Sequence, residues 1–307
     1  MSPLSRDLDE YLRVRRALGF GLVREGRLLP QFVCFLERQG HTAIRAPLAV
    51  RWALAPPGVS RRWAHARLAM VRGFARYLAA HDPRTEVPAL ELLPAPRTAR
   101  RVPYIYTDAE VCALMQMART LHGLKGATYA TLLGLLAATG MRVGEAIALQ
   151  RDDVDDLGGG LVVRHGKFGK SRELPLHPTT TAALRAYARE RDRVLRHPRS
   201  PSFLLSRAGT RLHYKNVHAA FLRLVHRVGL APHRPPRPRL HDLRHTFAVT
   251  TLVRWYRAGL DVEARLPALS TYLGHVAPSS TYWYLTATPA LLQLAQRRAQ
   301  RARQARP

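Results

Sequence analysis

The sequence predicts a mainly helical fold with a small antiparallel β-sheet, which belongs to the α+β class. Apolar residues recur at spacings of three and four over most of the 307 residues, as they do on one face of a helix. Only between Val154 and Leu176 does this period give way to short apolar runs separated by glycine-rich turns. With 47% hydrophobic residues and this length, the chain can bury more than one core. Two domains are therefore expected.

Residues 1–94 are predicted to form an all-helical domain. The helical period runs from Leu4 to about Leu92, and no clear strand interrupts it. Glycine and proline turns divide the region into about four short helices; these turns lie at 19–21, 40, 55–58 and 82–83. The following stretch, PAPRTARRVP, has three prolines and almost nothing to bury, so residues 95–102 are expected to form an extended linker.

Residues 103–307 are predicted to form a second, mixed domain. Thr107 precedes two acidic residues and an apolar run, which is typical of a capped helix start, and a buried helix is expected at Ala127–Thr139. Three short strands are predicted next: one around Val154, one at Leu161–Val163 and one at Glu173–Leu176. Further helices are predicted near 179–196, 215–228, 241–258 and 289–303.

The charge of the chain points to a polyanionic partner. The formal net charge is +28, from 49 Lys plus Arg against 21 Asp plus Glu. A field of that sign attracts nucleic acid, which is the leading partner class. A compositional bias is the alternative, because all but four of the basic residues are arginines. Such a bias does not explain why acidic residues are so few.

Cysteine content and hydropathy predict an intracellular protein. Cys34 and Cys112 are too few and too far apart in the sequence for a disulfide framework or a zinc site, so each is interpreted as a small buried apolar residue. The most apolar stretch, Ala127–Ala138, is shorter than the ~20 residues that span a bilayer. We therefore expect a cytoplasmic protein without membrane contact.

Two polar clusters interrupt the apolar pattern in the first half of the second region. In ATGMRVGEA, Arg142 and Glu145 follow the end of a buried helix at Gly140. A buried arginine needs a partner, and the plain interpretation is an ion pair at helical spacing. In GKFGK, Lys167 and Lys170 lie at the tip of a predicted hairpin, where lysines are usually solvated.

Two further clusters lie near the C-terminus. In LHDLRHTF, His241, Arg244 and His245 share roughly one side of a helix. A zinc site is disfavoured, because no HExxH arrangement is present and Arg244 would repel a cation, so an anion site fits better. The motif YLGH ends at His275 and is followed nine residues later by Tyr284, within an aromatic run that would by itself be assigned to packing.

The order of these clusters resembles that of the tyrosine recombinase or phage integrase family. An arginine, a hairpin lysine, HxxR, LGH and a tyrosine recur in the family's order and structural setting. The resemblance covers the whole chain. It implies a helical, SAM-like core-binding domain at 1–94 and a tyrosine recombinase catalytic domain at 103–307, which together clamp DNA.

The resemblance also implies the roles of matching residues. Arg142 and Arg244 would hold the non-bridging oxygens of the scissile phosphate, since guanidinium groups match that geometry. Tyr284 would attack the phosphorus and form a 3′-phosphotyrosine, which conserves the bond energy for rejoining. No metal or other cofactor is then required.

The remaining site residues would serve this step. His241 and His275 would add hydrogen bonds, and His241 could accept the tyrosine proton. Lys167 would protonate the leaving 5′ oxygen, and Glu145 would support other groups of the site indirectly.

Some assignments stay open on sequence grounds. Lys170 could replace Lys167 if the hairpin register differs, although the family pattern GKxxKxRxxPL favours Lys167. Tyr282 is close to Tyr284, but the nine-residue step from His275 selects Tyr284. His245 is expected to be structural. The C-terminal helix resembles a segment that docks on a neighbouring protomer, or it packs on its own domain.

The resemblance also implies the partners: double-stranded DNA, bound by a homotetramer in the synaptic complex, with accessory directionality factors and association with the nucleoid. The SSTYWYLTATP run resembles that of recombinases carried by mobile elements, which favours integration or transposition of a mobile element. A non-catalytic helix-turn-helix regulator is the alternative from another class, but it leaves the four clusters unexplained. A type IB topoisomerase is a related alternative, and the N-terminal helical domain favours a recombinase.

Overall fold

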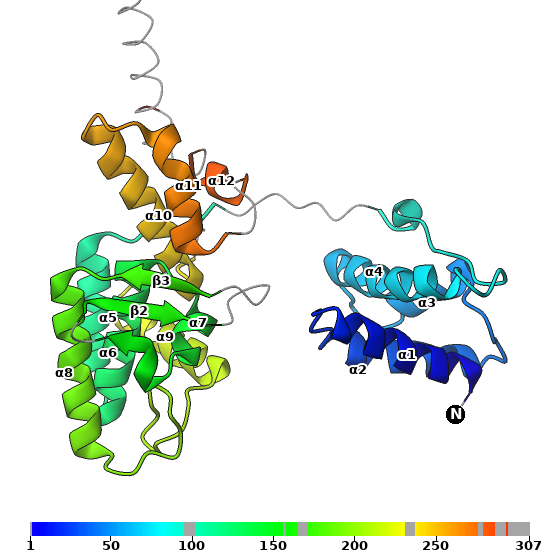
Figure 1. Ribbon diagram of the computed structural model, residues 1–307, viewed down its shortest axis with the longest axis horizontal. Coiled ribbons are helices and arrows are strands. Elements are labelled where there is room, and N and C mark those ends of the chain that lie inside the picture. The colour runs from blue at the N-terminus through cyan, green and yellow to red at the C-terminus, as the bar shows by residue number, and fades with distance from the viewer. Residues whose placement is uncertain are drawn as a thin grey trace, which may run out of the picture. The chain divides into compact units, whose positions relative to one another are not determined.

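A computed structural model describes residues 2–94, 102–155, 158–164, 171–230, 237–275, 279–285 and Gln293 (Figure 1). The chain divides into two compact units, Met1–Arg100 and Arg101–Pro307. The mainly helical fold with a small antiparallel sheet is confirmed. None of the described helices is both long and apolar enough to cross a membrane.

The described residues of the first unit, 2–94, form four α-helices and one short 3-10 helix. These are α1 (Pro3–Ala17), α2 (Glu25–Glu37), α3 (Ala46–Leu54), α4 (Arg61–Leu78) and η1 (Leu90–Leu92). Serine side chains cap two of them: Ser2 accepts the backbone N–H of Ser5, and Ser60 accepts that of Trp63. Apolar side chains from all four α-helices form a single core.

The second unit contains eight of the described α-helices. They are α5 (Asp108–Arg119), α6 (Leu124–Thr139), α7 (Val143–Ala148), α8 (Pro178–Val194), α9 (Tyr214–Arg227), α10 (Leu240–Arg257), α11 (Val262–Leu273) and α12 (Ser279–Leu285). Thr107 and Glu110 form a full capping box at the start of α5, as the sequence predicts. Helix α6 is buried on almost every side, because its sequence is apolar all round.

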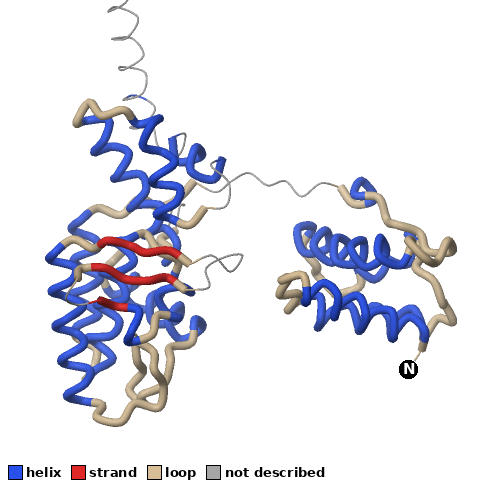
Figure 2. The backbone as a smooth tube through the Cα atoms, viewed as in Figure 1, coloured by secondary structure: helices blue, strands red, loops and turns tan. Residues whose placement is uncertain are grey.

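Where the structure describes it, the sheet of the second unit has three short antiparallel strands in the order β1-β2-β3 (Figure 2). They are β1 (Val154–Asp155), β2 (Gly160–Val163) and β3 (Arg172–Pro175), preceded by the 3-10 helix η2 (Arg151–Asp153). Leu161 pairs with Leu174, and both are buried in the main core. The turn that carries Lys167 and Lys170 lies outside the described residues.

Two apolar clusters meet along α10 in this unit. Leu240 and Leu243 belong to the main core, which also contains α5, α6 and the sheet. One turn later Ala248 and Leu252 belong to a second cluster, formed with α11 and α12. Figure 1 shows α10, α11 and α12 together at one end of the unit. Arg244 therefore lies on α10 where one core ends and the other begins.

Two features differ from expectation. Helix α11 was not predicted, because Pro267 breaks the apparent pattern within it, although Asp261 caps its first turn. The interpretation of Cys34 and Cys112 as buried residues is wrong, since both are exposed. Cys34 lies on the outer face of α2, whose buried residues are Leu29, Phe32, Val33 and Leu36.

Two further predictions fall mostly outside the described residues. Of the predicted helix at 289–303 only Gln293 is described, and of the linker at 95–102 only Val102.

Candidate active site

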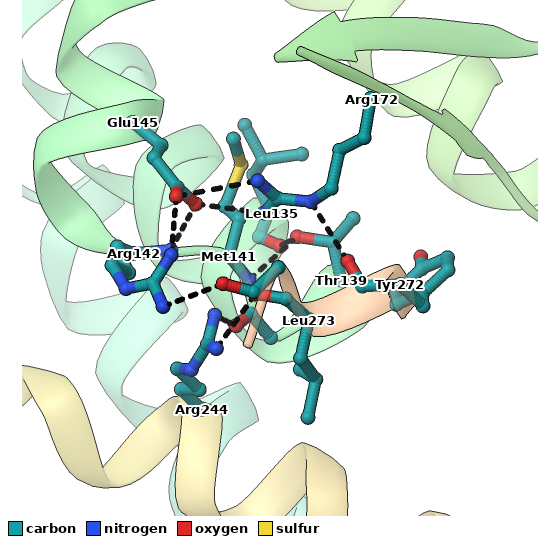
Figure 3. Close-up of polar contacts among 11 residues, drawn as sticks. Leu135, Thr139, Met141, Arg142, Glu145, Arg172, Arg244, Tyr272 and Leu273 are labelled. Atoms are coloured by element: carbon teal, nitrogen blue, oxygen red, sulfur yellow. Dashed lines mark hydrogen bonds and ion pairs between the residues drawn. The ribbon is translucent and has the colours of Figure 1, made fainter. Parts of the chain in front are cut away.

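Five segments of the second unit bring polar side chains together at the junction of its two cores. Arg142 starts α7, Arg172 lies on β3, His241, Arg244 and His245 lie on α10, His275 follows α11, and Tyr284 is part of α12. Figure 3 shows the arginines of this group around Glu145 and the chain at Leu273. The sequence separates these residues by up to 142 positions, so only the fold assembles them.

Arg142 is held by its own turn and by the end of α11. Its Nη1 donates to Glu145 Oε1 at 2.7 Å, and its backbone N–H donates to Glu145 Oε2 at 2.9 Å. Its Nη2 donates to the carbonyl oxygen of Gly274 at 2.9 Å. The ion pair at helical spacing is therefore present, but the same guanidinium also reaches a segment 132 residues away. That second contact places it inside the cluster.

Arg172 is a member of the site that the sequence did not single out. Its Nη2 donates to Glu145 Oε2 at 2.8 Å, and its Nε donates to the carbonyl oxygen of Tyr272 at 2.8 Å. It therefore ties β3 to α7 and α11 at once (Figure 3). Its position within the GKxxKxRxxPL pattern was the available signal, but spacing alone did not indicate which groups it would contact.

Glu145 is the carboxylate that these two arginines share. Its side chain is only 8% exposed. Burial by itself raises the pKa of Glu145, but the hydrogen bonds and charges of Arg172 and Arg142 outweigh it, so the pKa lies below its usual value. The carboxylate is thus ionised at neutral pH and orients both guanidinium groups.

Arg244 is fully buried and has no carboxylate partner among the described residues. It is 2% exposed, and it donates to the carbonyl oxygens of Gly140 at 2.9 Å and Leu273 at 2.7 Å. Burial, and then the charge of Arg142, lower its pKa to about 10, so it stays protonated at neutral pH. Three guanidinium groups face one carboxylate in this cluster, which leaves two positive charges uncompensated. Such a site favours an anion.

Two glycines permit this close arrangement. Gly140 ends α6 with φ +60°, and Gly274 ends α11 with φ +67°. A Cβ on Gly140 would lie 2.6 Å from the Phe247 ring, and one on Gly274 would lie 2.7 Å from Arg172 Nη1. A side chain at Gly140 would displace Phe247, and one at Gly274 would displace the Arg172 guanidinium.

His275 and His241 flank the arginines. His275 Nδ1 is 2.7 Å from Thr281 Oγ1, which leaves Nε2 as the ring atom available to a ligand. Burial and the charges of Arg244 and Arg142 lower the pKa of His275 to about 4. The His241 side chain is exposed overall, yet partial burial of its ring and the charge of Arg244 lower its pKa as well. Because its pKa is about 4, His275 is neutral at pH 7 and can donate or accept a proton.

His245 is closer to the site than the sequence indicates. Its ring lies edge-on to His241, with centroids 4.7 Å apart, and 5.5 Å from the Tyr284 ring. Its Nδ1 is buried without a hydrogen-bond partner within the described part of the chain. Burial, then the charge of His241, lower its pKa to about 3. It packs between two residues to which the sequence assigns chemistry.

The two candidate tyrosines occupy different environments. Tyr284 is 2% exposed, whereas Tyr282 is 52% exposed. The Tyr284 ring stacks on His275 with centroids 6.0 Å apart and also contacts Trp283. Burial raises the pKa of Tyr284, while the charge of Arg244 and a hydrogen bond from it act in the opposite direction. Only Tyr284 therefore lies inside the cationic cluster.

Comparisons with known proteins agree with this arrangement. The model of the Phage integrase family matches residues 105–290. A protein of Sinorhizobium fredii named integrase/recombinase y4rB is 43% identical over 311 residues, covering 98% of each chain. Tyrosine recombinase XerC of Herpetosiphon aurantiacus is 32% identical over 223 residues, covering 71% of this chain and 67% of its own. The integrase of transposon Tn1549, solved in complex with transposon right end DNA, superposes with a TM-score of 0.63 at 18% identity, covering 95% of this chain and 99% of that chain.

Proposed function

Because the chain belongs to the phage integrase family of tyrosine recombinases, we propose that it recombines double-stranded DNA at specific sites through a 3′-phosphotyrosine at Tyr284. Enzymes of this family cleave and rejoin DNA strands, and this chain is one of them. One observation carries the assignment of the nucleophile. The Tyr284 phenol is buried beside Arg244, whereas the neighbouring Tyr282 faces outward.

The two arginines of the cluster are suited to the scissile phosphate. In the free protein Arg142 and Arg244 use part of their donors on backbone carbonyl oxygens. Each guanidinium has five N–H groups, so donors remain for the non-bridging oxygens. The two uncompensated charges would offset the negative charge that builds up in the pentacoordinate state. Glu145 holds Arg142 directly, and Arg172 holds Glu145 and the Tyr272 carbonyl, so both would position the site without touching the phosphate.

The proton transfers follow from the same environment. Because burial raises the pKa of Tyr284, the phenol needs a base, and His241 is the proposed acceptor. The phenol oxygen then bonds to phosphorus while the bond from phosphorus to the 5′ oxygen breaks. His275 would hydrogen-bond a phosphate oxygen through Nε2. Lys167, which lies outside the described residues, would give its proton to the leaving 5′ oxygen.

Charge and the comparisons support the wider setting. The first unit carries 17 arginines against 8 acidic residues, and this positive charge supports a DNA-binding role for residues 1–94. The full-length likeness to y4rB and to a transposon integrase favours movement of a mobile element. A homotetramer at the synapse, directionality factors and association with the nucleoid complete the proposal.

A trapping experiment tests the assignment. A tightly bound duplex is first selected from random sequence. It is then nicked next to each candidate scissile phosphate, so that the short 5′-hydroxyl fragment diffuses away after cleavage. The protein is incubated with it in EDTA without ATP and run on a denaturing gel. We expect a covalent adduct with wild type and with Tyr282→Phe, and none with Tyr284→Phe. If a tightly bound duplex gives no adduct with wild type, the chain is a DNA-binding regulator instead.

A further inference from the structure

Helix α12 holds the His275 ring from two sides. Thr281 Oγ1 lies 2.7 Å from His275 Nδ1, and the Tyr284 ring stacks on the His275 ring with an interplanar angle of 20°. Thr281 and Tyr284 are three residues apart on α12, so they share one face of the helix. The nucleophile and a hydrogen-bond partner of His275 therefore come from the same helical turn. No step proposed above uses Thr281.

The Thr281 side chain is enclosed by the protein. The residue is 1% exposed, and a hydroxyl in such a place requires a hydrogen-bond partner. The structure provides one in the His275 ring nitrogen. Valine has nearly the shape of threonine but no hydroxyl, so packing alone would not need this polar contact.

The chemistry of the scissile phosphate decides which atom of this pair donates. Non-bridging phosphate oxygens only accept hydrogen bonds, so His275 Nε2 must carry a proton to contact one. Burial and the charges of Arg244 and Arg142 lower the pKa of His275 to about 4, so at neutral pH the ring has a single proton. With that proton on Nε2, Nδ1 is a bare acceptor. A hydroxyl can donate to it, whereas an ionised carboxylate could not.

The cations of the site oppose this tautomer until the phosphate is bound. Arg244 and Arg142 act on His275 as positive charges, and a bare Nε2 is favoured near them over an N–H group. In the free protein the Thr281 hydroxyl can accept a hydrogen bond from Nδ1–H. Once the phosphate offsets the cations, the hydroxyl can rotate and donate instead. Thr281 can thus satisfy His275 in both states.

We propose that Thr281 is a positioning residue for DNA cleavage, whose hydroxyl donates to His275 Nδ1 in the DNA complex and supports the tautomer with a proton on Nε2. This inference rests on the proposed function, in which His275 contacts the scissile phosphate. Thr281 acts through His275 and does not itself contact the DNA. Because Tyr284 lies on the same helix, one docked position of α12 both places the nucleophile and orients His275.

The rate of adduct formation at saturating DNA measures what the hydroxyl contributes. Thr281→Val should be about 10- to 100-fold slower than wild type, the range known for groups that orient a metal-bound histidine. Thr281→Ser keeps the hydroxyl and should stay within about threefold of wild type. The matched control is Thr128→Val, which removes an equally buried hydroxyl that contacts Tyr187 and the Leu205 carbonyl. Its rate should stay within about twofold of wild type, because Thr128 shares no partner with His275.

A double-mutant comparison separates action through His275 from a structural role. In a His275→Ala background, Thr281→Val should change the rate by less than about twofold, because the ring that it orients is absent. A fall by the same factor in both backgrounds would overturn the proposal. Equal slowing by Thr281→Val and Thr128→Val would also overturn it, since both would then act through stability alone.

Nitrogen NMR of histidine-labelled protein detects the ring proton directly. Tyr284→Phe is bound to the selected duplex, which it cannot cleave, and the His275 signals are assigned by their loss in His275→Ala. We expect a protonated Nε2 and an unprotonated, hydrogen-bonded Nδ1. Adding Thr281→Val should shift the Nδ1 resonance, and adding Thr281→Ser should leave it in place. A protonated Nδ1 in the complex would contradict the proposal.

The two experiments keep this inference distinct from the proposed function. The NMR complex is never cleaved, so its result does not depend on the adduct assay. Absence of an adduct with wild type would contradict the proposed function. A normal wild-type adduct with equal rates for wild type and Thr281→Val would contradict only the role of Thr281.

Discussion

Arg172 is the residue on which the charge balance of the site depends. Replacing it with Met removes the two hydrogen bonds that Arg172 donates to Glu145 and the one that it donates to the Tyr272 carbonyl, and leaves a nearly buried carboxylate with Arg142 alone. Bonds to charged groups contribute ~1.5 to 3 kcal/mol each, but they are not additive, so we expect a loss of about 2 to 4 kcal/mol in the free energy of unfolding. Urea denaturation checks this.

The control for that variant is Arg119→Met, which breaks an exposed ion pair with Glu190. Its cost should be under about 1 kcal/mol, because exposed pairs contribute little. Arg172→Met should also slow adduct formation at saturating DNA, and Arg172→Lys should restore less than half of the lost rate, since lysine lacks the planar fork. Equal stability of the two methionine variants would contradict the account.

Lys167 and Lys170 can be separated by changing the leaving group. A 5′-bridging sulfur leaves as a thiolate, which has a pKa of ~8.5 and needs no proton donor. Lys167→Ala should therefore cleave normal DNA at least ~100-fold more slowly than wild type and recover on the sulfur substrate, as expected for loss of a general acid. Lys170→Ala should show no such recovery. If only Lys170→Ala recovers on the sulfur substrate, Lys170 is the general acid instead of Lys167.

Two partly buried histidines make stability depend on pH. The pKa values of His275 and His245 are about 4 and about 3 in the folded protein, against about 6.5 in an unfolded chain. Below pH 6.5 the unfolded chain binds protons that the native state excludes, so the free energy of unfolding falls as pH decreases through this window. His245→Gln should weaken the loss between pH 7 and pH 5 by roughly 1 to 2 kcal/mol. If the free energy of unfolding falls equally with pH in wild type and in His245→Gln, His245 does not cause the pH dependence.

At the scale of elements, the turn between α6 and α7 sets the spacing of the two catalytic arginines. Gly140→Ala would place a Cβ against the Phe247 ring at a positive φ. Strain and overpacking together should cost about 2 to 4 kcal/mol and abolish adduct formation. Gly144→Ala lies four residues away inside α7, where no atom comes within 4 Å of the added Cβ. It should be neutral or stabilising by up to ~1 kcal/mol. Thermal melts and the adduct assay distinguish the two.

Local signals in the sequence predict most elements well. The Thr107 cap, the apolar α6 and the three strands follow from short-range patterns that hold in the structure. Helix α11 was missed because Pro267 masks its period, and the exposed Cys34 shows that residue type does not decide which helix face is buried. Both depend on neighbours distant in sequence.

In the candidate site too, short-range sequence patterns do not predict contacts between residues that lie far apart in the sequence. The motif order could suggest Arg142, Arg244, His275 and Tyr284, and the structure brings these together with Arg172 and His245. The links of Arg172 to Glu145 and Tyr272 join strand, loop and helix over as many as 100 residues. No spacing within one segment could indicate them.

At the scale of the whole molecule, the charge of +28 is distributed over both units, with +9 on residues 1–100 and +19 on residues 101–307. Within the described part of the second unit, Arg142 and Arg244 lie in one cationic group with Tyr284. A positive field over both units attracts DNA, and the group around Tyr284 is where we expect binding to become covalent chemistry.

Mass spectrometry of the trapped adduct is the most direct test of that claim. Digestion with nuclease and trypsin should yield a peptide that runs from Leu266 to Arg297 and includes Tyr272, Tyr282 and Tyr284. Fragmentation should locate the remaining nucleotide phosphate on Tyr284. A modified Tyr282 or Tyr272, with Tyr284 unmodified, would contradict the account.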